Sequence, residues 1–203
     1  VIGDIVYDSK GDPSTIPGSL KHVKAIGWYI EEFGISQISM NLTNINQTPI
    51  HVVFDEVSKK AEKRGARVTG SEIVGLIPLK PMLDAGKYFL KKQNRSIGIP
   101  EIDIISIAVE SLGLNQVKKF IPEKNIIEYY LDTLFDDKKK IIELKATEFS
   151  DEVARESPAP GGGSVAAYVG ALGSSLGEMV ANLSANKRGW EDRVENFSTI
   201  ANK

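Results

Sequence analysis

The stretch that decides the fold is residues 35–65, "ISQISMNLTNINQTPIHVVFDEVSKKAEKRG". Its first nine residues mostly alternate apolar and polar side chains, which is the periodicity of a β-strand. From Thr48 onward, apolar side chains recur every three or four residues. Thr48 can cap a helix there, Pro49 suits its first position, and Gly65 can end it. A strand followed directly by an amphipathic helix predicts layered packing of a sheet and helices.

Similar signals continue on both sides of this stretch. We predict further helices at residues 20–33, from Pro78 to about Leu90, and at 101–112 before Gly113, and further strands at residues 5–7, 66–77 and 125–131. Helices that alternate with strands at such short spacing favour a small α/β sandwich.

The composition changes after Leu131. A charged stretch centred on residues 136–140 reads as part of a linker, and no strand signal follows it. We predict a helix from Thr147 to about Arg155 and a longer one from Ser164 to about Asn186. This gives three parts, which are an α/β subdomain at 1–132, a linker at 133–146 and the beginning of a helical domain at 147–203.

Composition excludes several classes of function. The net charge of −2 and the pI near 5.8 give no basic field for nucleic acid or an acidic membrane surface. The absence of cysteine excludes disulfides, thiol nucleophiles and cysteine metal sites, and it fits a reducing cytoplasm. His22 and His51 lie near the starts of two separate predicted helices and are not arranged as a metal pair, so no metal is expected. No apolar run is long enough to span a membrane. The chain opens at Val1 in a strand-like phrase, so we expect a fragment of a longer protein.

The glycine cluster "SPAPGGGS" at residues 157–164 raises the question of a nucleotide site. It lacks the Lys-Ser/Thr pair of a Walker loop and the sixth-position glycine of a dinucleotide fingerprint. Two other uses remain. The exposed N–H groups at a helix start can bind an anion such as a carboxylate, or the glycines can allow a sharp turn and close helix packing with Ser164 as N-cap.

Three polar residues are further candidates for ligand contact. Asn41 begins a polar run at the end of a predicted strand, His51 lies near a helix N-terminus where its neutral form is favoured, and Glu72 lies between Gly70 and Gly75. Each has an alternative role without a ligand. Asn41 can bond to its own backbone in a loop, His51 can be a structural histidine, and the Glu72 carboxylate can face water.

Longer motifs carry a resemblance to a known family. "GSEIVGLIPLK" at 70–80 and "LGLNQVKKFIPEKNIIEYYL" at 112–131 resemble the C-terminal subdomain of glutamate formimidoyltransferase. "SPAPGGGSVAAYVGALGSSLGEMV" at 157–180 resembles the start of formimidoyltetrahydrofolate cyclodeaminase. Their order on one chain resembles the bifunctional formimidoyltransferase-cyclodeaminase family.

The resemblance implies an α+β fold, with a ferredoxin-like α/β sandwich followed by the first helices of an all-α bundle. It implies transfer of a formimidoyl group from formimidoylglutamate to tetrahydrofolate, the co-substrate, and then cyclodeamination to methenyltetrahydrofolate with release of ammonia. This chemistry belongs to histidine degradation, in a cytoplasmic homo-oligomer.

The resemblance also bears on individual residues. The family's catalytic histidine and aspartate lie outside this chain, so no catalytic residue is expected within it. Asn41, His51 and Glu72 are expected to line one wall of the folate site. The last part of the site prediction is a contact of the folate glutamate carboxylates with Gly161, Gly162, Gly163 and Ser164.

Two other functions fit the same residues. One is a non-catalytic module that binds folate or assembles subunits through its helical tail. The other is a methenyltetrahydrofolate cyclohydrolase.

Overall fold

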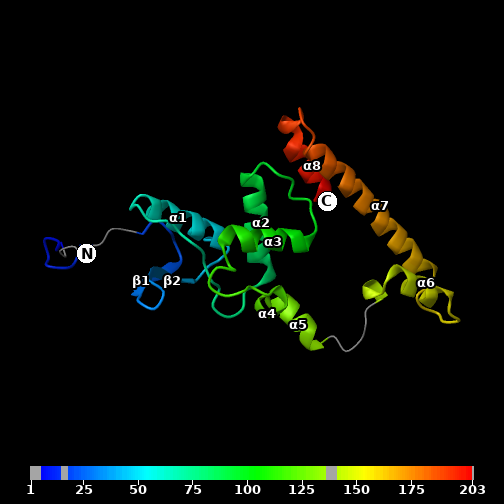
Figure 1. The fold of residues 1–203 in the computed structure, drawn as a ribbon, viewed down its shortest axis with the longest axis horizontal. Coiled ribbons are helices and arrows are strands. Elements are labelled where there is room, and N and C mark those ends of the chain that lie inside the picture. The colour runs from blue at the N-terminus through cyan, green and yellow to red at the C-terminus, as the bar shows by residue number, and fades with distance from the viewer. Residues whose placement is uncertain (1–5, 15–17, 136–140, 203) are drawn as a thin grey trace. The chain divides into compact units, whose positions relative to one another are not determined.

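The computed structural model describes residues 6–14, 18–135 and 141–202 of the chain (Figure 1). They divide into two compact units, and the boundary falls between Glu56 and Val57. The first unit contains a two-stranded sheet, and the named elements of the second are all helical. The mixed α+β class predicted from the sequence is therefore confirmed.

The sheet is an antiparallel hairpin of β1 (Val23–Ile30) and β2 (Ile35–Leu42). Gly34 lies in the turn between the strands with a φ of 63°, a conformation that favours glycine. The helix predicted at residues 20–33 is therefore wrong. β1 is rich in β-branched and aromatic side chains, which suit a pleated backbone. The three-to-four spacing of apolar residues suggested a helix, but the backbone N–H and C=O groups of this segment form their hydrogen bonds with β2.

The first long helix is α1 (Ile50–Glu62), as predicted. Val53 is buried on its inner face, and Gly65 ends the helical segment with a φ of 72°. The hydroxyl of Thr48 donates a 2.6 Å hydrogen bond to the carbonyl oxygen of Lys21. This bond ties the start of α1 to the segment that leads into β1.

The core of the second unit forms between α2 (Leu79–Lys92) and α3 (Glu101–Leu112). The helices cross closely, because a Cβ placed on Gly86 would lie 2.1 Å from the carbonyl oxygen of Ile104. Gly113 ends α3 with a left-handed φ of 63°. Both helices were predicted, and α3 has the predicted bounds. The side chains at their interface that are almost completely buried are Met82, Ala85, Leu90, Ile105 and Ala108.

Two strands predicted in this unit are absent from the part of the chain that the structure describes. Within the segment 66–77, only Ile77 pairs, in an isolated parallel bridge to Ile126. Residues 125–131 instead lead from α4 (Pro122–Asn125) into α5 (Ile127–Phe135). The strand prediction failed here because it considered only residues 125–131. The apolar residues at 127, 130, 131 and 134 have helical spacing, which becomes clear only when the longer segment is considered.

The tail contains a 3₁₀ turn, η1 (Ile141–Glu143), then α6 (Ala146–Ala154) and α7 (Gly162–Ala185). A second 3₁₀ turn, η2 (Glu191–Arg193), leads into α8 (Val194–Ala201). The two predicted helices are present, but α7 begins two residues before Ser164, so Gly161 is its N-cap and Ser164 is not. The predicted linker centre at 136–140 lies outside the described residues. No described helix is long and apolar enough to cross a membrane.

Candidate functional site

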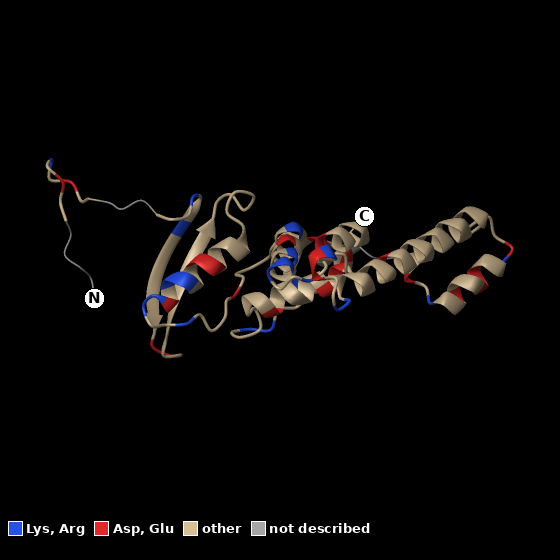
Figure 2. Ribbon diagram, turned by 90° about the horizontal axis from the view of Figure 1, so that it is seen from above, with Lys and Arg blue, Asp and Glu red and all other residues tan. Residues whose placement is uncertain are grey.

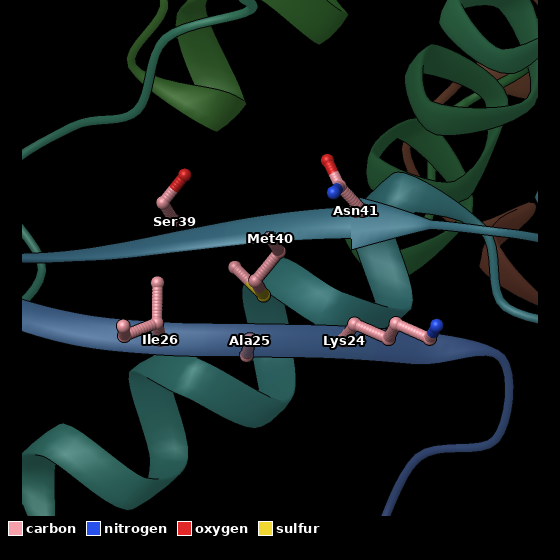
Figure 3. Close-up of a pocket in the computed structure, with 6 residues that line it drawn as sticks. All are labelled: Lys24, Ala25, Ile26, Ser39, Met40 and Asn41. Atoms are coloured by element: carbon pink, nitrogen blue, oxygen red, sulfur yellow. The ribbon is translucent and has the colours of Figure 1, made fainter.

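The hairpin presents an open depression in the first unit (Figure 3). Lys24 lies opposite Asn41 and Ile26 lies opposite Ser39, so their side chains share one face of the sheet. Figure 3 shows Ser39 and Asn41 pointing to the same side of β2. Ala25 and Met40, which pair with each other and point to the opposite face, also border the depression.

The size of the depression limits what it can do alone. It measures about 200 Å³, whereas a site that encloses a small molecule occupies about 300–1,000 Å³. The hairpin is therefore suited to one wall of a binding site, not to a complete pocket.

Asn41 and Lys24 give this wall its chemistry. The Asn41 amide can donate and accept hydrogen bonds, and the Lys24 ammonium can pair with an anion. Both side chains are exposed. Asn41 was among the predicted ligand contacts, but Lys24 was not, because residues 20–33 were predicted to be a helix. The signal that identifies Lys24 is its register opposite Asn41.

His51 occupies a different place in the same unit. It lies in the first turn of α1 with 9% of its surface exposed, and it is not part of the lining of the depression. Its position near the helix N-terminus agrees with the sequence. Direct contact between its ring and a ligand stays a prediction.

Glu72 lies in the second unit, in a segment fixed at both ends. The Ser71 hydroxyl donates a 2.6 Å hydrogen bond to the carbonyl oxygen of Leu112, at the end of α3. At the other end, the Ile77 N–H donates to the carbonyl oxygen of Asn125 over 2.9 Å. Glu72 is exposed between these anchors. The carboxylate is thus presented from an anchored loop and not from the predicted strand.

The glycine cluster lies at the start of α7. Gly161 precedes the helix and Gly162 is its first residue, so the N–H groups of the first turn have no helical acceptor. Within the described residues, a Cβ on Gly162 or Gly163 would meet no atom within 4 Å. Close packing within these residues therefore does not require the two glycines. Ser164 lies in the first turn.

α7 exposes most of its surface. Glu178 is the only charged residue along its length, and Figure 2 shows the helix almost free of charge. Cβ atoms on Gly170, Gly173 and Gly177 would each meet open space. We call the exposed apolar side chains and these glycines the α7 apolar surface; its large members are Tyr168, Val169, Leu172, Leu176, Met179, Val180 and Leu183.

The described residues contain no group of three or more His, Asp or Glu side chains that could hold a metal ion. The hydroxyl of Tyr129 donates a 2.6 Å hydrogen bond to Oε1 of Glu101. Burial and the Glu101 carboxylate raise the pKa of Tyr129 above its ordinary range. The bond connects α5 to the first turn of α3.

These features define an α+β protein whose hairpin presents an open polar face and whose chain continues into an apolar helix. The chain belongs to the Formiminotransferase domain family, which matches residues 5–132. A second family, Formiminotransferase-cyclodeaminase, matches residues 145–203. The resemblance found in the sequence is confirmed.

Curated relatives agree with both matches. The chain is 43% identical over 175 residues to the formimidoyltransferase-cyclodeaminase of Gallus gallus, and 39% identical over 175 residues to that of Dictyostelium discoideum. Each alignment covers 86% of this chain and 32% of the relative. The glutamate formimidoyltransferase of Streptococcus pyogenes serotype M1 is 35% identical over 77 residues, which are 38% of this chain and 26% of that protein. The chain thus spans about a third of the length of the bifunctional relatives.

Proposed function

We propose that this chain is part of a folate-dependent enzyme that transfers a formimidoyl group from formimidoylglutamate to tetrahydrofolate. The same enzyme then closes the ring to methenyltetrahydrofolate and releases ammonia, in histidine degradation. The observation that carries the proposal is the succession of the two family matches, at 5–132 and 145–203, on one chain. We place this enzyme in the cytoplasm.

The test is an assay of the intact protein with formimidoylglutamate, with and without tetrahydrofolate. The proposal expects methenyltetrahydrofolate and ammonia in equal amounts, and only when tetrahydrofolate is present. Consumption of formimidoylglutamate without tetrahydrofolate would contradict it. Hydrolysis of methenyltetrahydrofolate with no transfer would support the cyclohydrolase alternative.

The division of labour along the chain is part of the proposal. We assign residues 1–132 to the transferase subdomain, 133–146 to the linker and 147–203 to the start of the cyclodeaminase domain. The bounds of the two family matches support this division.

For the transferase part, we propose that the hairpin face forms one wall of the tetrahydrofolate site. Tetrahydrofolate carries a pterin ring with adjacent donors and acceptors and a glutamate with two carboxylates. The Asn41 amide is suited to the pterin edge, and the Lys24 ammonium is suited to a carboxylate. His51 would support the wall from within the unit, and Glu72 would contact the ligand from its anchored loop.

For the helical part, we propose that Gly161, Gly162, Gly163 and Ser164 receive a folate carboxylate at the start of α7. The free N–H groups of the first helical turn and the positive end of the helix dipole support this role. Close approach of a helix from outside the described residues is the competing use of the same glycines.

We further propose that the intact protein is a homo-oligomer and that assembly covers the α7 apolar surface. An apolar surface of this extent is unusual on a monomer and typical of an interface. The same surface favours the alternative function of a non-catalytic assembly module. Folate binding by the intact protein separates the two, because assembly alone does not require it.

A further inference from the structure

The loop between α2 and α3, residues 93–100, makes a contact that the candidate site does not use. The backbone N–H of Ile97 donates a 2.9 Å hydrogen bond to Oγ of Ser198 in α8. The side-chain amide of Asn182 in α7 donates to the carbonyl oxygen of Gly98. One donor and one acceptor of the loop backbone are thus satisfied by side chains from the helical tail.

The backbone of the loop also lies very close to the end of α8. A Cβ on Gly98 would lie 2.2 Å from the Cβ of Ala201 and 2.4 Å from its carbonyl carbon, so a side chain at position 98 would force the two backbones to move apart. Beside it, Nζ of Lys87 donates a 3.1 Å hydrogen bond to Oδ1 of Asn202. Ser96 and Ser198 are buried, with 4% and 7% of their surfaces exposed.

This contact lies at the C-terminal end of α7. Ala181 and Ala185, near its C-terminus, are buried, as is Val194 at the start of α8. The large apolar side chains further toward the N-terminus of α7 are exposed. The tail is therefore buried where α7 and α8 pack against each other, beside the loop.

We propose that the α2–α3 loop is a docking site for the paired ends of α7 and α8. The loop belongs to the segment matched by the first family and the helices belong to the segment matched by the second. Docking holds the two segments in one orientation, so they do not move independently about their connection. Because both sides are on one chain, the effective concentration is high and a few hydrogen bonds with a close steric fit suffice.

Hydrogen exchange at the Ile97 amide in the intact protein tests the proposal. Ser198→Ala removes the acceptor, and Thr199→Ala is the matched control, because the Thr199 hydroxyl donates to the Glu195 carbonyl oxygen on the exposed face of α8. We expect Ser198→Ala to accelerate exchange at Ile97 by roughly tenfold and Thr199→Ala to leave it unchanged. Rapid exchange in the wild type, or equal effects of both variants, would overturn the proposal.

A second experiment does not depend on the stability of the serine variant. Residues 1–203 contain no cysteine, so within them the pair Gly98→Cys and Ala201→Cys can be oxidised without competition from native thiols. Their Cβ atoms need to separate only to the roughly 3.8 Å of a disulfide. We expect an intramolecular cross-link in most chains, while each single variant shows none. A double variant that cross-links only between molecules would overturn the proposal.

Discussion

Lys24 and Asn41 lie directly opposite each other across the β1–β2 hairpin. The pairing places an ammonium and an amide on one open face, beside the apolar side chain of Ile26. A flat heteroaromatic ligand with a charged tail matches such a face, because its ring can lie on apolar carbon while its polar edge and tail meet the amide and the ammonium. The hairpin is therefore the part of the chain whose chemistry can be tested most sharply.

Trp28 offers a spectroscopic probe of this face. It lies two residues beyond Ile26, on the same side of β1, and is 45% exposed. We expect tetrahydrofolate to quench an emission component that Trp28→Phe removes and that Trp190→Phe retains, since Trp190 stacks on Phe197 in the other unit. After correction for ligand absorbance, quenching that survives Trp28→Phe unchanged would place the ligand elsewhere.

The glycines of α7 give opposite predictions for the single chain and for the assembly. Gly173→Leu introduces a better helix former into open space, so we expect helix stability to rise by about 1 kcal/mol. If the α7 apolar surface packs in an oligomer, the same change weakens assembly. Light scattering coupled to size exclusion of the intact protein should show smaller particles for Gly173→Leu and no change for Ser174→Ala. Unchanged particle mass for both variants would exclude this face as the interface.

The helices that could be predicted are those with local punctuation. Pro49 and Gly65 bracket α1, and Pro78 and Gly113 stand at the outer ends of α2 and α3. These signals act through backbone geometry, so they do not depend on the rest of the chain. Elements whose backbone hydrogen bonds come from residues distant in the sequence could not be identified from such local signals.

The hairpin and the Glu72 segment illustrate that limit. β1 has helical spacing, but the following strand supplies its hydrogen bonds. The segment after Gly65 has a strand-like composition, but it forms no strand ladder with the described residues. A hydrogen bond to the end of α3 and another to the Asn125 carbonyl oxygen hold it instead. For the site, Asn41 could be predicted because it begins a polar run at the end of a strand. Lys24 could not, because its role depends on register.

The crossing of α2 and α3 predicts a large cost for a small substitution. Gly86→Ala forces a Cβ against the Ile104 carbonyl oxygen, so we expect the free energy of unfolding to fall by about 1–3 kcal/mol. Gly177→Ala, at a helical glycine with open space around it, is the control and should be neutral or stabilising. Urea denaturation measures both. Equal stability of the two variants would contradict the close crossing.

Tyr129 predicts a pH dependence at the alkaline end. Its pKa in the folded protein is raised above the ordinary value of 10.0, first by burial and then by Glu101. The neutral hydroxyl is therefore favoured by folding, and its contribution is complete below pH 10 and is lost as the pH rises toward the folded pKa. Tyr129→Phe should lower stability at neutral pH by about 1 kcal/mol and should reduce the loss seen above pH 10. An unchanged alkaline slope in thermal unfolding would contradict the assignment.

The most direct test of the account is the dissociation constant of tetrahydrofolate for the intact protein, measured by calorimetry for four forms. They are the wild type, Lys24→Gln, Asn41→Ala and the control Ser36→Ala, which alters the opposite face of the hairpin. We predict that Lys24→Gln weakens binding about tenfold and Asn41→Ala about fivefold, while Ser36→Ala has no effect. Wild-type affinity in both Lys24→Gln and Asn41→Ala would contradict the claim that this hairpin forms a wall of the folate site.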